Sequence, residues 1–297
     1  MREHPILVGY DGSAASTAAL RWALGEAERR SLGVRVVRVL DIPRRANPTP
    51  ASRATEAHMF DEAEVALDQI AATATAGLRR AVPLTTAALA GPVVDALCEQ
   101  SRQASLTVLG SRGVGGLAGL LLGSVSVAVA AHAHSPVAVV REHMSAAPGR
   151  PVLVGVDGSD VAGLALEFAF AEAAARGVRL RAVHAVPGEG AEPAGQQLLT
   201  RALEPYRRRY PQVTVVERVV PGTPGPLLAT ASLDAQLVVV GSRGRGGFHG
   251  LLLGSVSQQV LHRAGCPVAV VRRYATPAPR TTLRATTGTV GSPERTR

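Results

Sequence analysis

A glycine-rich pattern with the chemistry of a phosphate site occurs twice in the chain. In each copy Gly-Ser-Arg-Gly is followed by nine residues and then by Gly-Ser, over residues 110–124 and again over 241–255. Glycines let the backbone approach a phosphate closely, and a helix that begins at the second Gly-Ser directs unpaired amides toward the anion. The donors predicted for one site are Gly110, Ser111, Arg112, Gly113, Gly123, Ser124 and Ser126, and those for the other are Gly241, Ser242, Arg243, Gly244, Gly254, Ser255 and Ser257.

This pattern is not a Walker A sequence, because GxxxxGK[ST] is absent and the chain contains no lysine. Phosphate charge would therefore be neutralised by backbone amides, hydroxyls, Arg112 or Arg243, and a metal ion. The alternative interpretation is that the glycines only make a tight turn between a strand and a helix. Repetition of the same spacing in both copies favours the phosphate site.

One carboxylate in each copy could complete such a site. Asp11 and Asp157 each follow a short hydrophobic run, at the expected carboxyl end of a first strand. A carboxylate there could accept hydrogen bonds from a ribose or hold a nucleotide-bound magnesium ion through water. The alternative is a structural cap for the next helix, although Ser13 and Ser159 are better placed for that role.

The elements that must position these residues are themselves repeated. Residues 6–13 read ILVGYDGS and residues 152–159 read VLVGVDGS, while 110–126 and 241–257 are identical at 14 of 17 positions. Two copies of one domain therefore lie in tandem. The predicted divisions are nucleotide-binding domains at 1–143 and 150–273 and a disordered Arg/Thr/Pro-rich tail at 274–297.

Each copy alternates Val/Ile/Leu runs with Ala-rich segments of helical length. This alternation predicts an α/β fold, two tandem doubly wound five-stranded parallel sheets with helices on both faces. Strands are expected at 6–10, 34–40, 85–90, 106–110 and 136–140, and again at 151–156, 179–186, 212–220, 236–241 and 267–272. The first helix of each copy is predicted to begin after Ser13 or Ser159 and to stop at Gly33 or Gly177.

Together these motifs resemble the universal stress protein family in its tandem two-domain form. The resemblance rests on the V-G-x-D-G-S strand end, the glycine pattern and the closing P-V-x-V-V strand, and it extends from Ile6 to Arg273. It implies the strand order 3-2-1-4-5 and, since members with this glycine pattern bind ATP, an ATP site in each domain. It further implies site contacts from Gly9, Val39 and Val125 in the first copy, and from Gly155, Ala185 and Val256 in the second.

Composition sets the broad class of protein. The chain has 297 residues, of which 46% are hydrophobic and only 3% aromatic, which is typical of a globular protein with an Ala/Val/Leu interior. Cys98 and Cys266 fit neither a disulfide framework nor a zinc spacing, so a reducing, cytoplasmic location is expected. Neither a signal peptide nor a membrane segment is predicted.

The basic charge is concentrated at one end. The net charge is +9, and the six arginines and one glutamate of the last 26 residues contribute +5 of it. The chain is poor in the aromatic side chains that single-strand binding uses, so nucleic acid is not the expected partner. If the tail did bind nucleic acid, the affinity would depend steeply on salt.

The leading functional hypothesis is an ATP-binding stress or regulatory protein, with Mg²⁺ carried by the nucleotide and no dedicated catalytic or metal-binding side chains. A slow ATPase or nucleotidyl-transfer enzyme is the alternative, but it needs a general base that the sequence does not display. The last strand of each copy is expected to pair with the other copy, and possible homodimerisation would use the same edges, because an uncovered apolar edge is a liability.

Overall fold

The computed structural model describes residues 4–42, 49–114, 122–142, 149–244, 253–273 and 285–288. The sequence between the domains, at 143–148, and most of the tail lie outside these ranges. The first domain contains β1 (Ile6–Gly9), α1 (Ala14–Arg30), β2 (Val34–Leu40), α2 (Pro50–Ala74), β3 (Leu84–Ala90), α3 (Val93–Gln100), a 3₁₀ turn at Ser101–Gln103, β4 (Leu106–Gly110), α4 (Ser124–His132) and β5 (Val137–Val140). The second contains β6 (Val152–Gly155), α5 (Asp160–Arg176), β7 (Leu180–Val186), α6 (Glu192–Arg209), β8 (Val215–Pro221), α7 (Pro224–Ala231), a 3₁₀ turn at Ser232–Asp234, β9 (Leu237–Gly241), α8 (Ser255–Arg263) and β10 (Val268–Val271).

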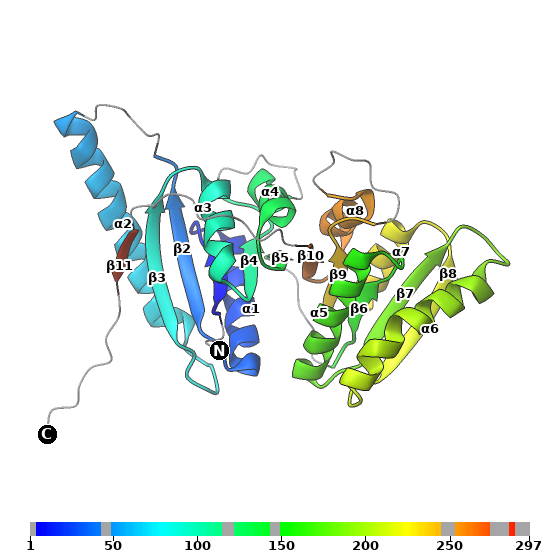
Figure 1. Cartoon of the computed structure of the whole chain (residues 1–297). Coiled ribbons are helices and arrows are strands. Elements are labelled where there is room, and N and C mark those ends of the chain that lie inside the picture. Colours follow the sequence, from blue (N-terminus) through cyan, green and yellow to red (C-terminus); the bar gives the residue numbers. More distant parts are fainter. Residues whose placement is uncertain are drawn as a thin grey trace, which may run out of the picture.

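Each domain has a parallel sheet in the predicted order, 3-2-1-4-5 (Figure 1). β1 lies between β2 and β4, with Ile6 opposite Val34 on one side and Leu106 on the other. In the second domain β6 lies in the same way between β7 and β9. The doubly wound α/β fold expected from the alternating pattern is confirmed. The ends of β1 and β4, and of β6 and β9, are therefore neighbours.

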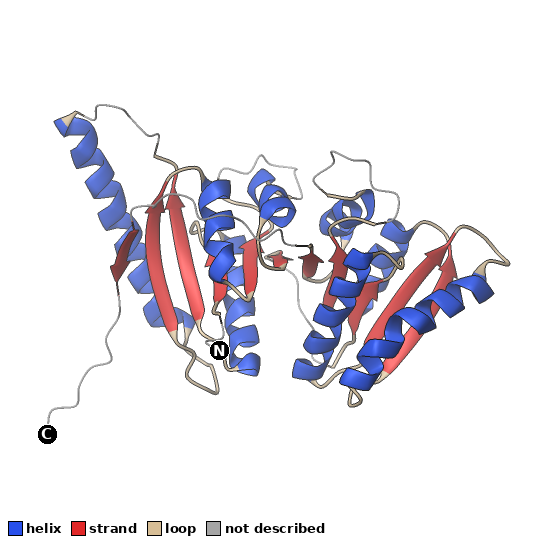
Figure 2. Ribbon diagram, viewed as in Figure 1, coloured by secondary structure: helices blue, strands red, loops and turns tan. Residues whose placement is uncertain are grey.

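Helices cover both faces of each sheet (Figure 2). On one face, α1 and α2 bury small side chains such as Ala19, Ala23 and Ala63 against β1 and β2, and α5 and α6 form the matching layer of the second domain. On the other face, the four short helices α3, α4, α7 and α8 share a single core that runs through both domains. Small Ala and Val side chains let the helices and strands approach one another closely. The core is therefore filled with few aromatic residues.

The caps of the first helices follow the sequence prediction in three of four cases. The hydroxyls of Ser13 and Ser159 accept hydrogen bonds from the third residue on, and Gly177 ends α5 with a φ of 62°. The prediction for Gly33 is wrong, because α1 ends at Arg30 and Ser31 takes the left-handed position, with a φ of 56°. Gly33 is needed for space instead: a Cβ there would lie 3.2 Å from the Pro83 carbonyl oxygen.

The last strands of the two domains join their sheets. β5 and β10 pair antiparallel, with Val139 opposite Val268, so that ten strands and the short β11 (Ala285–Gly288) form one continuous sheet. The expected pairing of the domains through these edges is thus observed within the chain. Alternating Val and Ala side chains on both strands are fully buried at this junction.

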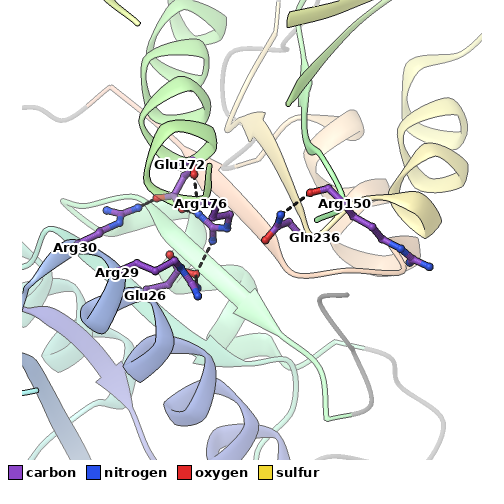
Figure 3. A network of polar contacts seen from close by, with 7 residues as sticks. All are labelled: Glu26, Arg29, Arg30, Arg150, Glu172, Arg176 and Gln236. Carbon is purple, nitrogen blue, oxygen red and sulfur yellow. Dashed lines mark hydrogen bonds and ion pairs between the residues drawn. The ribbon is translucent and has the colours of Figure 1, made fainter. Parts of the chain in front are cut away.

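A charged cluster between α1 and α5 also joins the two domains (Figure 3). Arg176 of α5 donates to Glu26 of α1 at 2.5 Å and also pairs with Glu172, while Arg30 of α1 pairs with Glu172. Both glutamates are fully buried. Trp22 and Phe168 flank the cluster, each with an arginine of the other domain over its ring, at 6.0 and 5.7 Å. Charges this deep must be paired, so the cluster fixes how α1 and α5 meet.

Four residues of the tail form a strand where disorder is predicted. β11 pairs antiparallel with β3, with Thr286 opposite Ala88, and thereby covers the outer edge of the first sheet. An unpaired edge of β-forming residues offers a row of free backbone donors and acceptors, which is the physical reason that a tail segment rich in threonine can dock there. For the other residues of the tail, disorder remains a prediction.

Candidate functional site

The ends of β6 and β9 place the second aspartate beside the second glycine turn, which we define as Gly241–Gly244. The Oδ1 atom of Asp157 accepts hydrogen bonds from the Ser159 backbone N–H at 3.0 Å and from the Ser159 hydroxyl at 2.6 Å. A Cβ on Gly244 would run into Oδ2 of the same carboxylate. The absence of a side chain on Gly244 lets its backbone lie against this carboxylate.

Hydrogen bonds fasten this turn to the sheet and to the next helix. The Ser242 N–H donates to the Val271 carbonyl at the end of β10, at 2.7 Å, and the Ser242 carbonyl accepts from the Gly254 N–H, also at 2.7 Å. Gly254 is the N-cap of α8 and offers no side chain to the first-turn amides. Ser257 points inward and donates to the Gly254 carbonyl at 2.8 Å. Amides of the first turn of α8 are thus left for a ligand.

A cavity of about 510 Å³ lies where these elements meet. Its volume is in the range of small-molecule sites, roughly 300–1,000 Å³. Of the eleven residues predicted from sequence for the second site, the cavity lining includes all except Ser242, which is buried. The ten residues that line it are Gly155, Asp157, Ala185, Gly241, Arg243, Gly244, Gly254, Ser255, Val256 and Ser257.

The cavity lining combines polar and apolar side chains. Asp157, Arg243 and Ser255 provide a carboxylate, a guanidinium and a hydroxyl at the glycine turn. Sequence analysis missed the apolar lining, which is Val156, Ala162, Val183, Pro224, Leu228, Val240 and Leu253. Nothing local marks Leu228 or Pro224 as site residues, because α7 reaches the cavity only through the packing of the fold. The alternation of β7 does put Val183 and Ala185 on the same face.

The first domain has the same arrangement at its first glycine turn, Gly110–Gly113. Asp11 accepts hydrogen bonds from the Ser13 N–H at 3.0 Å and from the Val114 N–H at 2.9 Å. A Cβ on Gly113 would lie 2.5 Å from Asp11 Oδ2. Burial of this carboxyl raises its pKa, but the hydrogen bonds that it accepts, chiefly from Ser13, lower the pKa more, so Asp11 is an anion at neutral pH.

Several predicted site residues have a structural task as well. The Ser126 hydroxyl donates to the Gly110 carbonyl at 2.7 Å, so it does not project from the helix as a free donor. Gly9 leaves room for Leu97 and Leu109, and Gly155 for Leu228. Val39 packs at the edge of the core, whereas Ser124 and its counterpart Ser255 are exposed at the helix start. Gly123 donates to the Ser111 carbonyl as Gly254 does to Ser242.

The fold and the site define a tandem α/β protein with a cavity at the carboxyl end of a parallel sheet. The model of the universal stress protein family matches residues 3–141 and 149–272. The chain therefore belongs to the universal stress protein family, with two such domains, as the sequence resemblance implied. No helix among the described residues combines the length and hydropathy needed to cross a membrane.

Known relatives share the whole two-domain arrangement. Two universal stress proteins of Mycobacterium tuberculosis are each 39% identical to this chain: one alignment covers 92% of this chain and 96% of the relative, the other 92% and 98%. The crystal structure of a universal stress protein from Archaeoglobus fulgidus matches it with a TM-score of 0.68 and 25% identity, over 92% of this chain and all of that one.

Proposed function

We propose that this universal stress protein binds ATP at one site in each domain and acts as a nucleotide-dependent regulatory protein. The observation that carries the proposal is the cavity at the ends of β6 and β9, where ten independently predicted residues gather beside a helix start without a side-chain cap. A nucleotide combines an apolar base with an anionic phosphate chain. The cavity lining combines apolar side chains with the Arg243 guanidinium and the amides of a helix start.

Each part of the nucleotide has a counterpart in this cavity. Val183, Leu228 and Val240 would pack on the adenine, and Asp157 would accept hydrogen bonds from the ribose hydroxyls. The phosphates would lie against the backbone of the second glycine turn, the first turn of α8 and the Arg243 guanidinium. The first domain would bind a second nucleotide through Asp11 and the first glycine turn.

Magnesium enters the proposal only with the nucleotide. Among the described residues, no three His, Cys, Asp or Glu side chains gather as a metal site. One carboxylate beside a phosphate site suits an ion whose other ligands are water and phosphate oxygens. Asp157 or Asp11 would hold such an ion through its water, and the ion would neutralise phosphate charge.

A binding experiment on a single-site variant tests the proposal. Equilibrium dialysis with ATP should give two nucleotides per wild-type chain. Gly244→Val should give one, because the added side chain displaces Asp157 and blocks the turn. Gly188→Val is the matched control, since a Cβ at Gly188 meets nothing within 4 Å, and it should still bind two. Absence of nucleotide on the folded wild type, or two nucleotides on folded Gly244→Val, would overturn the proposal.

The enzymatic alternative calls for a different measurement. A single-turnover assay with stoichiometric ATP and Mg²⁺ should return ATP intact over the lifetime of the complex if the protein only binds and signals. Rapid, complete formation of ADP or of an adenylated product would favour the ATPase or transferase instead.

A further inference from the structure

Each domain extends one arginine onto the end of a helix of the other domain. Arg141, which follows β5, donates through Nη1 to the Ala264 carbonyl at 3.0 Å and through Nη2 to the Leu261 carbonyl at 2.6 Å, at the C-terminal end of α8. Arg272, the equivalent residue after β10, donates through Nη1 to the Ala133 carbonyl at the end of α4, at 3.4 Å. A cation is favourable at a helix C-terminus.

The opposite ends of these two helices are the phosphate ends of the candidate sites. α8 begins at Ser255, inside the cavity of the second domain, and α4 begins at Ser124, in the equivalent place of the first. A helix of nine residues is a rigid rod about 13.5 Å long. Arg141 of the first domain thus holds one end of the helix whose other end forms the second domain's site, and Arg272 does the reverse.

The same arginines are tied to the glycine turn of their own domain. The Ser111 N–H of the first turn donates to the carbonyl of Val140, the residue before Arg141, at 2.7 Å. Ser242 makes the equivalent bond, also at 2.7 Å, to the residue before Arg272. Burial lowers the pKa of Arg141, and the positive charge of Arg112 lowers it further.

Side-chain packing also connects α4 with α8. Val129 and Ala133 of α4 belong to the same buried cluster as Val260 and Ala264 of α8. Well-packed interiors resist local rearrangement, so a shift of one helix is felt by the other.

We propose that Arg141 and Arg272 couple the two nucleotide sites, so that filling one site strengthens binding at the other. The inference rests on the proposed function. Phosphates at the first turn hold the Ser111 backbone in place, and its hydrogen bond to Val140 then fixes Arg141 against the C-terminal end of α8. The first-turn amides of α8 are thereby held in place for phosphates in the second domain. By the pseudo-symmetry, Ser242, Arg272 and α4 act in the other direction.

Titration of full-length variants with ATP tests the coupling. The wild type should bind its two nucleotides cooperatively, with about a fivefold higher affinity for the second, the low end of typical coupling between sites. The Arg141→Ala, Arg272→Ala double variant should bind two nucleotides independently. Arg208→Ala is the matched control, because this exposed arginine pairs with Glu204 on its own helix, and the variant should remain cooperative.

Variants that keep only one nucleotide site distinguish a positioning role of Arg141 from general damage to the fold. In Gly113→Val, where the second site remains, Arg141→Ala should weaken ATP binding about two- to fivefold, the effect of a charge at a helix end. In Gly244→Val, where the first site remains, Arg141→Ala should leave affinity unchanged. Equal losses at both sites would mean a merely structural role and overturn the coupling.

The failure of the two proposals can be told apart. Two nucleotides bound with equal, independent affinities by the wild type, unaffected by the arginine variants, would overturn the coupling and leave ATP binding in place. A folded wild type that binds no ATP would overturn both.

Discussion

Asp11 accepts, through Oδ2, a hydrogen bond from the Val114 backbone N–H at 2.9 Å, across 103 positions of sequence. The other oxygen of the same carboxylate accepts from the Ser13 N–H. A single side chain thus ties the first glycine turn to the start of α1. The two interpretations of this aspartate, as a ligand contact and as a local structural group, are therefore compatible, because the bond to Val114 shapes the turn that would hold the phosphate.

Replacing both aspartates, Asp11→Asn with Asp157→Asn, should weaken ATP binding by roughly 1.5–3 kcal/mol per site, the range for hydrogen bonds to charged groups. An asparagine has one acceptor oxygen where the carboxylate uses two, and it carries no charge. Ser13 and Ser159 still cap α1 and α5, so the double variant should fold, with a melting temperature lowered only modestly by the lost hydrogen bonds. Affinity and melting temperature measured on one preparation decide the matter: normal affinity with a lower melting temperature would make the aspartates purely structural.

Acid should release the first turn at a pH set by Asp11. The folded-state pKa of this carboxyl lies below its usual value of 3.8, so its hydrogen bonds add stability above that value. The contribution should be lost as the pH falls through the lowered pKa. Hydrogen exchange at the Val114 amide, followed by NMR from pH 6 downward, should show protection until that point. Loss of protection above pH 5 would contradict the assignment.

The charged cluster between the domains should be costly to break in part. Glu172→Gln leaves Arg30 and Arg176 without their shared carboxylate, and removal of one member of a buried ion pair typically destabilises by about 3–5 kcal/mol. Urea unfolding followed by circular dichroism measures the loss. Asp234→Asn is the control: it removes an exposed partner of Arg181 and should leave the urea midpoint nearly unchanged. Equal midpoints for both variants would show that the cluster is energetically neutral.

Neither cysteine should react in the folded protein. Burial raises the pKa of Cys98 to about 11 and that of Cys266 to about 12. At pH 8 the thiolate, which is the reactive form, is then roughly a thousandth or less of either residue. Mass spectrometry after exposure to iodoacetamide should find both thiols unmodified in native protein and both alkylated in urea. Rapid native labelling of either would show that it is not buried as described.

Removal of the tail should expose the outer edge of β3. The sequence of that strand, LTTAALA, carries no charge, whereas its counterpart β8 carries Glu217, Arg218 and Pro221. Charges and proline protect a strand edge from pairing, so β3 depends on its cover. A chain ending at Arg273 should dimerise as its concentration rises, measured by light scattering. A chain ending at Gly288, which keeps β11, should not, and equal behaviour of both would refute this role for β11.

Sequence reasoning located the strands of both sheets except β11, together with the glycine turns and both N-caps, because these depend on local patterns. Ser13 and Gly177 are examples in which backbone geometry demands particular residue types. The role of Ser31 as the left-handed C-cap of α1 was missed, because residue preferences at helix ends favour glycine there. They do not reveal that a serine can occupy the position when the next strand requires it. Leu228 and the partnership of Arg141 with α8 were missed for a different reason: contacts between distant elements exist only once the sheet order and the joining of β5 to β10 are known.

Because β5 and β10 pair within one chain, the joined sheet does not depend on the concentration of the protein. If the two domains were separate proteins, the fraction assembled would depend on their concentration in the cell. The covalent connection holds the edge strands β5 and β10 near each other. For a short linker, their effective concentration is on the order of millimolar. The joined sheet, and with it any communication between its two halves, therefore survives at abundances where a pair of separate domains would fall apart.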